Sequence, residues 1–260
     1  MLTAAAATSE GRAKIALAFT IAQWPYYTTR SIPVPVENEP AEVIAAMMAT
    51  AATLPSTIVS SFMYELQGAF PGNQYADYPA YFDNGDPMLK RLTKNLYRDA
   101  GLDLERDLRR IENTKRLRAD EAARNWWLSN PARTPRGELK MPVFRIHTTG
   151  DETVPIAEGQ VFDDMVLANG VSHLMRSSTV ERAGHCNFTL AEQLVALDTL
   201  ERRLDFGSWP STTVQQLNAR ASTLLPGGTS AFLDYRLREF NGAWRLELNP
   251  ERNRKNRDRD

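Results

Sequence analysis

The sequence has little of what several large protein classes require. Its 260 residues contain one cysteine, Cys186, which excludes an internal disulfide framework and any metal site built from several cysteines. No apolar run reaches the roughly 18 residues that a membrane-spanning helix needs. The formal net charge of −1 lacks the basic excess of a dedicated nucleic-acid binder. The N-terminus has no basic region before its alanines and therefore does not resemble a signal peptide, which leaves the localisation undetermined.

The composition that remains is that of an ordinary globular protein. Hydrophobic residues make up 42% of the chain and charged residues 24%, values typical of one domain with appendages. No spacing of histidines and carboxylates indicates a metal site, and no motif indicates a cofactor. We therefore expect a protein that uses neither a metal nor a cofactor.

The first half of the chain, residues 1–139, reads as helices joined by proline-rich connections. The stretch Glu10–Gln23 is a dense apolar helix that Pro25 ends. Pro40 is suited to the first turn of a second helix, where its missing N–H would have no partner anyway. The stretch Gly68–Pro87 is rich in glycine, proline and aromatic residues and is predicted to be a loop.

Residues 140–206 show a different pattern, which alternates strands and helices. Met141–His147 is predicted as a strand, Ala157–Asn169 as a helix and Leu174–Val180 as a second strand. Thr189 and Glu192 form a capping-box signature that opens a final helix. The apolar face predicted for that helix consists of Leu194, Leu197, Leu200 and Leu204. Such a βαβα unit predicts two parallel strands with a right-handed crossover.

The pattern becomes weaker after residue 206. Residues 207–248 are predicted to form a C-terminal extension, with a helix at Val214–Leu225 and short strands within Phe232–Leu248. Residues 249–260 are almost wholly polar, and we expect this tail to be disordered.

Two titratable residues follow the two predicted strands. Asp151 comes after the first strand and His185 after the second. The carboxyl ends of parallel strands meet at one edge of a sheet, and neighbouring strands lie about 4.8 Å apart, so the two side chains should touch. A carboxylate that orients an imidazole is what an acyl-transfer site needs, because the imidazole can then take a proton from a nucleophile.

Two motifs around these residues resemble those of the α/β-hydrolase superfamily. Thr149–Pro155 is similar to the G-D-x-x-V-P turn that carries the acid of that family, and Arg182–Phe188 is similar to its G-H-x-x-F turn. The resemblance covers about residues 8–205. It implies an α/β fold consisting of the C-terminal portion of an α/β-hydrolase, with the last two parallel core strands and a mostly helical cap. The cap resembles that of secreted esterases and peptidases of this fold.

The sequence departs from the family in lacking a nucleophile. The family order is serine, then acid, then histidine, with the serine in a G-x-S-x-G turn, and no such motif occurs here. Ser60 and Ser61 lack flanking glycines, whereas Ser172 and Ser230 come at the wrong places in the order. We therefore expect that the front half of the family fold is missing from this chain. The first core strand should then expose an unpaired edge, which favours association or low stability.

Several neighbouring residues have a simpler structural explanation. His147 is predicted to be a core or edge histidine and His173 a surface residue. Glu152 is the alternative acid, but Asp151 fits the motif spacing better. Cys186 is predicted to be a buried neutral thiol, since consecutive cysteine and histidine side chains rarely converge.

The sequence thus supports three functional hypotheses. In the first, the complete protein hydrolyses a small-molecule ester or amide through an acyl-serine, with Asp151 orienting His185 as general base and then acid, and this chain alone is inactive. In the second, the chain is a non-catalytic fragment or a binding protein that retains the scaffold. In the third, a separate chain supplies the missing N-terminal half. Neither nucleic acid nor a membrane is an expected partner, whereas self-association through the open sheet edge is.

Overall fold

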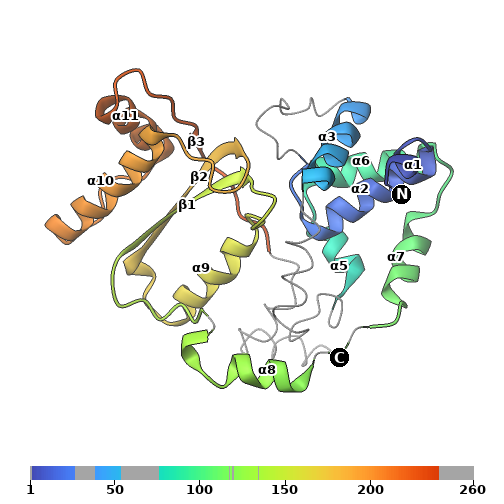
Figure 1. Cartoon of the computed structure of the whole chain (residues 1–260), viewed down its shortest axis with the longest axis horizontal. Helices are drawn as coiled ribbons and strands as arrows, with labels where there is room; N and C mark the ends of the chain where they lie inside the picture. Colours follow the sequence, from blue (N-terminus) through green and yellow to red (C-terminus); the bar gives the residue numbers. More distant parts are fainter. Residues whose placement is uncertain are drawn as a thin grey trace. The chain divides into compact units, whose positions relative to one another are not determined.

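The chain forms two compact units. The computed structural model describes residues 2–26, 39–53, 76–116, 118, 120–133 and 135–239. Among these, the helices before Arg136 belong to one unit, and the segment Gly137–Leu237 forms the other, which contains the sheet (Figure 1). None of the described helices is both long enough and apolar enough to cross a bilayer.

The helical unit follows the predicted pattern with one correction. Its helices are α1 (Leu2–Ala6), α2 (Ser9–Ala22), α3 (Pro40–Thr53), α5 (Tyr78–Asp83), α6 (Pro87–Asp99), α7 (Leu104–Glu112) and α8 (Glu121–Leu128), and a 3-10 turn, η1, spans Pro131–Arg133. The prediction of a loop over Gly68–Pro87 is wrong for its described part, because α5 lies there. The Asp77 side chain caps α5 by accepting from the Ala80 N–H, and Phe82 is buried. The polar tail at 249–260 lies outside the described residues.

The core of the helical unit forms among α2, α3 and α6. Phe19, Val43, Met47 and Leu89 are buried in one cluster. A hydrogen bond of 3.1 Å joins the buried hydroxyls of Thr20 and Thr93 across α2 and α6, which satisfies both polar groups inside this core.

The second unit is an α/β structure around a small mixed sheet. Its elements are β1 (Val143–Gly150), α9 (Glu158–Ala168), the 3-10 turn η2 (Ser172–Leu174), β2 (Met175–Ala183), α10 (Leu190–Phe206), α11 (Val214–Leu224) and β3 (Phe232–Leu233). The predicted parallel pairing of the two main strands is confirmed, with Val143 opposite Met175 and Thr148 opposite Val180. β3 pairs antiparallel with β2, in the strand order β1-β2-β3. Among the described strands, β1 therefore has a neighbour on one side only.

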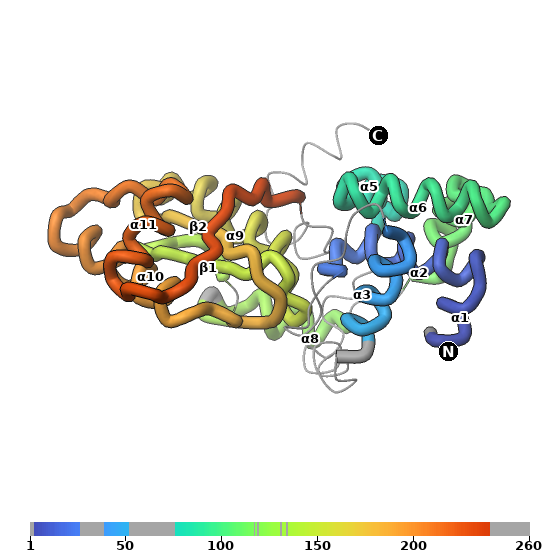
Figure 2. Tube along the Cα trace, turned by 90° about the horizontal axis from the view of Figure 1, so that it is seen from above, coloured from blue at the N-terminus to red at the C-terminus, as the bar shows by residue number. Residues whose placement is uncertain are grey.

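Alternation along β1 decides which helices cover which face of the sheet. Phe144 and Ile146 pack against the cluster of buried residues from β2, α10, α11 and β3. Arg145 points to the other face, where it bonds with the Gly159 carbonyl oxygen (2.9 Å) and with Asp163 (3.0 Å), both in α9. Successive side chains of a strand alternate between faces, so α9 lies opposite α10 and α11 (Figure 1; Figure 2 gives the view from above).

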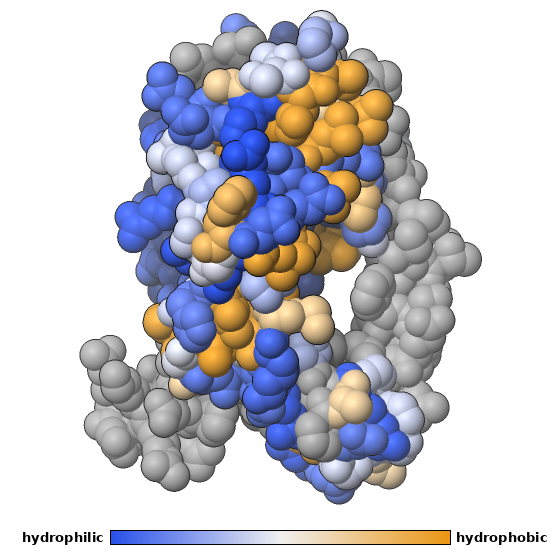
Figure 3. All heavy atoms as spheres, turned by 90° about the vertical axis from the view of Figure 1, so that its left-hand side faces the viewer, coloured by the Kyte–Doolittle hydropathy of each residue, from blue (hydrophilic) through white to orange (hydrophobic). Residues whose placement is uncertain are grey.

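The predicted apolar face of α10 is wrong for Leu197 and Leu204, whereas Leu194 and Leu200 are half-buried. The buried residues of this helix are Ala191, Glu192, Val195 and Thr199. The side chains of Leu197 and Leu204 are 54% and 61% exposed, respectively. Ala191 and Val195 pack in the cluster that contains Val180 of β2 and Phe232 of β3, so small residues rather than Leu197 and Leu204 face the sheet. Figure 3, which views the molecule from the side of α10 and α11, shows hydrophobic patches on this surface.

Candidate active site

The site begins with a tight turn at the end of β1. Asp151 follows the last residue of the strand, and only 4% of it is exposed. Its Oδ1 atom accepts hydrogen bonds from the backbone N–H groups of Thr153 (2.9 Å) and Val154 (2.8 Å). An aspartate that binds the backbone two and three residues ahead stabilises a local turn. This arrangement fixes the carboxylate and directs Oδ2 toward the neighbouring strand.

The turn after β2 is tied directly to the first one. Gly184 follows the end of β2 with a φ of 94°, a left-handed conformation that favours glycine. Its N–H donates to the Gly150 carbonyl oxygen (2.9 Å), and its own carbonyl oxygen accepts from the Thr148 hydroxyl (2.9 Å). The two strand ends are therefore joined by hydrogen bonds at the position where each delivers its titratable residue.

The two predicted site residues meet across this junction. His185 Nδ1 lies 2.8 Å from Asp151 Oδ2, and the histidine side chain is 45% exposed while that of the aspartate is almost fully buried. When Nδ1 carries the proton, it donates to the carboxylate and leaves Nε2 as a base that solvent or a substrate can reach. The pair thus has the geometry of a general base with its orienting acid.

Cys186 differs from its prediction as a buried thiol. The residue is exposed, and its Sγ lies 3.5 Å from His185 Nε2. A φ of 49° at Cys186 places the backbone in the left-handed region, and this bend brings two consecutive side chains together. A left-handed conformation at a non-glycine residue cannot be inferred from a sequence pattern. Because of it, the Cys186 thiol lies beside His185 Nε2, at the position where a nucleophile would contact the base.

His147 also lies beside Asp151. Its Nε2 is 2.9 Å from the Val154 carbonyl oxygen and 3.7 Å from Asp151 Oδ2, and its side chain is 15% exposed. Burial lowers the pKa of His147, which favours the neutral imidazole with its proton on Nε2 facing the carbonyl. This agrees with the prediction of a satisfied strand histidine. His173 is exposed in η2, as predicted.

Sequence reasoning missed one carboxylate near the pair. Glu158 begins α9 at an exposed position, where desolvation of its carboxyl group by neighbouring atoms, together with the negative charge of Asp151, raises its pKa to about 7. No motif marks this residue, because its influence depends on how α9 packs back toward Asp151. A group that titrates near neutrality beside the pair gives this edge of the sheet a pH-dependent charge.

A hydroxyl nucleophile is not present at His185 in the described part of the chain. No described serine forms a hydrogen bond with His185 Nε2: Ser230 donates to Asn218 (2.8 Å), and Ser172 lies in η2. Ser60 and Ser61 lie outside the described residues. The residues covered by the structure also contain no cluster of three or more histidine, cysteine, aspartate or glutamate side chains that could hold a metal ion.

One curated protein is similar to almost the whole chain. An o-phthalyl amidase of Xanthobacter agilis is 33% identical over 253 residues, which cover 94% of this chain and 56% of the amidase. The chain thus spans about half the length of that relative. No protein-family model matches the sequence, and no solved structure matches it.

Proposed function

We propose that this chain is the part of an amide hydrolase of the α/β-hydrolase type that carries the acid and the histidine. Asp151 holds the Nδ1 proton of His185, and Nε2 takes a proton from a nucleophile as that nucleophile attacks the carbonyl carbon of an amide. The same imidazole then gives the proton to the leaving amine. The observation that carries the proposal is the 2.8 Å contact between Asp151 and His185 at the ends of two parallel strands.

The similarity to a protein named as an amidase supports an amide rather than an ester as the substrate. That name also suggests the class of amide to try first, an aromatic dicarboxylic acid joined to an amine through one of its carboxyl groups. Fold-level likeness does not specify a substrate, so the choice of amide rests on the sequence similarity.

The nucleophile and the donors that stabilise the oxyanion are proposed to come from further polypeptide. That polypeptide would correspond to the part of the Xanthobacter protein that this chain does not match. A parallel strand added to the edge of β1 that has no neighbour among the described strands would place its own carboxyl end beside Asp151 and His185, where a nucleophile could reach Nε2. Under this proposal, the chain alone has little or no activity.

The test combines this chain with the remaining segment of the relative. The chain is co-expressed with the segment of the Xanthobacter amidase outside the matched region, and release of o-phthalate from an o-phthalyl amide is measured. We expect turnover only from the combination. His185→Gln should lower it about 10³-fold or more, whereas His173→Gln, which changes an exposed histidine elsewhere, should not. Equal turnover by the combination with and without His185 would contradict the proposal.

The chain alone provides a second check. Hydrolysis of p-nitrophenyl esters by the purified chain that His185→Ala abolishes would show that a nucleophile is already present. Cys186 would then be the first residue to replace, because its Sγ is 3.5 Å from the base.

A binding protein that retains the scaffold is the second candidate. It is favoured by the lack of a hydrogen bond between any described serine and His185 Nε2. Its test is binding of the same o-phthalyl amide to the chain by calorimetry. Unchanged affinity in the Asp151→Asn, His185→Ala double variant would support binding without catalysis, and loss of affinity would tie the ligand to the proposed active site.

A further inference from the structure

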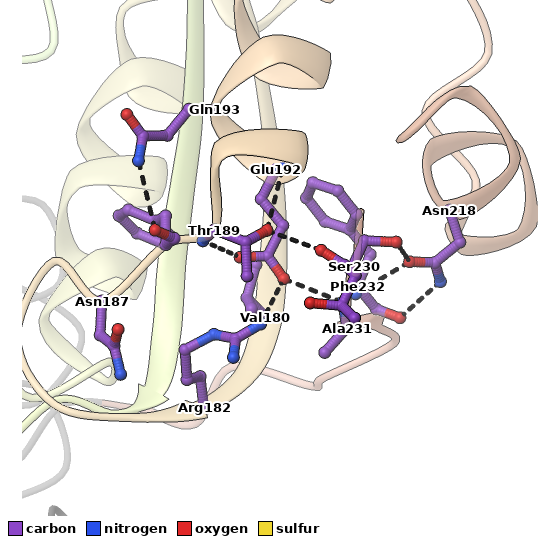
Figure 4. Close-up of polar contacts among 12 residues, drawn as sticks. Val180, Arg182, Asn187, Thr189, Glu192, Gln193, Asn218, Ser230, Ala231 and Phe232 are labelled. Carbon is purple, nitrogen blue, oxygen red and sulfur yellow. Dashed lines mark hydrogen bonds and ion pairs between the residues drawn. The ribbon is translucent and has the colours of Figure 1, made fainter. Parts of the chain in front are cut away.

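The turn that carries His185 is held at both of its ends by one buried side chain. Glu192 lies in the first turn of α10 and has no exposed surface. Its Oε1 accepts from the Arg182 guanidinium (2.7 Å), at the end of β2 before the turn. Its Oε2 accepts from the backbone N–H of Thr189 (2.7 Å), after the turn. A single carboxylate thus binds both Arg182 and Thr189, the residues on either side of the turn that contains His185 (Figure 4).

The same carboxylate also holds the segment next to β3. Oε1 accepts a further hydrogen bond from the Ala231 N–H (2.9 Å), and the Thr189 hydroxyl donates to the Thr229 carbonyl oxygen (2.7 Å). Three separate pieces of chain therefore meet at Glu192: the end of β2, the start of α10 and the approach to β3. All these contacts lie within the α/β unit.

Arg182 depends strongly on this carboxylate. Its side chain is 25% exposed, and in the described structure its Nε atom is buried without a hydrogen-bond partner. Removal of one partner from a buried ion pair leaves the other charge uncompensated, which costs far more than the pair itself contributes. Loss of the Glu192 charge would therefore drive Arg182 toward solvent and release the end of β2.

We propose that Glu192 is a positioning residue for His185. By fixing Arg182 and Thr189 together, it holds the intervening turn so that the Nδ1 proton of His185 stays directed at Asp151. The catalytic meaning of this role rests on the proposed function, whereas the role in orienting the imidazole does not. The described hydrogen bonds and ion pairs of Glu192 do not include His185, and in this proposal the residue acts only through the turn.

Asn218 offers a matched control in the same unit. This α11 residue accepts from the Ser230 hydroxyl (2.8 Å) and from the Phe232 N–H (3.2 Å), and donates to the Phe232 carbonyl oxygen (3.0 Å). It therefore holds the same β3 segment as Glu192 but contacts neither flank of the histidine turn (Figure 4). Asn218→Ala should loosen β3 without moving His185.

The test follows the Nδ1 proton of His185 by NMR in the full chain with ¹⁵N-labelled histidine. The chain has three histidines, so the spectrum contains few imidazole signals. The signal that is absent from the spectrum of His185→Gln belongs to His185. Each variant is compared at the same number of degrees below its own Tm, so that a general loss of stability cancels. We expect Glu192→Gln to raise the solvent-exchange rate of this proton about tenfold, equivalent to about 1.4 kcal/mol, and Asn218→Ala to leave it within about twofold.

Two results would overturn the proposal. An exchange rate unchanged in Glu192→Gln, or raised equally in both variants, would reduce Glu192 to a residue that only stabilises the fold. Absence of the signal from the parent chain would mean that the imidazole is not held by Asp151 at all. Should Glu192→Gln fail to fold, Arg182→Met removes the same ion pair, and the exchange rate of the Nδ1 proton in that variant is compared with the rate in Asn218→Ala. A tenfold change together with no amide hydrolysis in the combined system would retain the positioning role and reject the proposed function.

Discussion

At the scale of single residues, the candidate site depends on how Asp151 divides its two oxygen atoms. Oδ1 is used by two backbone N–H groups of its own turn, and Oδ2 is left for His185. All these partners are donors, so the side chain at this position must accept on both sides. An amide cannot do so, because one of its two terminal atoms is itself a donor.

Asp151→Asn should therefore weaken both the fold and the histidine contact. Either the amide NH₂ group faces the Thr153 and Val154 N–H groups, or it faces His185 and forces a different tautomer. We expect a loss of about 1–3 kcal/mol in the free energy of unfolding, measured with urea, which is the usual cost of an unsatisfied buried polar group. Asp205→Asn, at an exposed position of α10, should stay within about 0.5 kcal/mol of the parent. If the Asp151→Asn variant proved as stable as the Asp205→Asn control, the turn would not need the carboxylate.

Two groups beside Asp151 make the stability depend on pH in opposite directions. His147 has a lowered pKa, so below its ordinary pKa of 6.5 the unfolded chain binds a proton more readily, and stability falls as the pH falls. Glu158 has a pKa raised from 4.5 to about 7, so the folded chain binds a proton more readily in that range. Its contribution therefore becomes less favourable as the pH rises from about 4.5 to 7.

Glu158→Gln isolates the second of these effects. The variant cannot ionise at this position, so its stability relative to the parent should increase between pH 4.5 and 7 and then remain constant. Chemical unfolding at a series of pH values measures this difference. Glu201→Gln, at an exposed position of α10, is measured over the same range as the control. A difference for Glu158→Gln that does not change with pH, or that changes equally in the control, would show that the raised pKa is not a property of the folded chain in solution.

The residues of the pair could be predicted from the sequence, but their surroundings could not. Asp151 and His185 follow strands that apolar patterning reveals, and parallel pairing brings strand ends together. The contact of Cys186 with His185 instead depends on one left-handed backbone conformation at a non-glycine residue. The influence of Glu158 depends on where α9 lies on the sheet. Neither leaves a periodic signal in the sequence.

At the scale of elements, α10 shows the same division between local and tertiary information. Its capping box, Thr189 with Glu192, is encoded within four consecutive residues and is confirmed: the Thr189 hydroxyl accepts from the Glu192 N–H while the Glu192 carboxylate accepts from the Thr189 N–H. Its buried face was predicted incorrectly at Leu197 and Leu204, because hydrophobicity alone favours leucine over alanine or threonine. The structure instead buries Ala191 and Val195 in the cluster that contains Val180 of β2 and Phe232 of β3, and that packing is tertiary information.

The cap of α10 should contribute more than an ordinary helix cap. Besides capping, the Thr189 hydroxyl donates to the Thr229 carbonyl oxygen, so Thr189→Ala breaks a link to another segment as well as a helix terminus. We expect it to lower the free energy of unfolding by about 1–2 kcal/mol. Thr213→Ala removes the corresponding cap of α11, where the hydroxyl accepts from the Gln216 N–H at a longer 3.4 Å, and should cost less. Thermal or urea unfolding of the two variants measures both losses in the free energy of unfolding. Equal losses in Thr189→Ala and Thr213→Ala would contradict the added role of Thr189.

At the scale of the whole molecule, three features favour association. Among the described strands β1 has a neighbour on one side only, and an unpaired edge can pair with another chain. α10 presents Leu190, Leu197 and Leu204 at seven-residue intervals, each more than half exposed. A net charge of −1 gives little repulsion between copies. Two surfaces that normally require covering are therefore exposed on the same α/β unit.

We expect the isolated chain to self-associate as its concentration rises, with the leucine face of α10 as the dominant contact. The charge introduced by Leu197→Lys should shift sedimentation velocity profiles toward the monomer. Leu167→Lys, which makes the same change at a 65% exposed leucine on the opposite side of the sheet, should have little effect. If both variants associate like the parent, the edge of β1 becomes the contact, because a strand edge pairs through backbone groups that neither substitution changes. A parent chain that remains monomeric at every concentration and unfolds cooperatively at high temperature would show that neither surface needs a cover, and the case for a missing neighbour of β1 would fail with it.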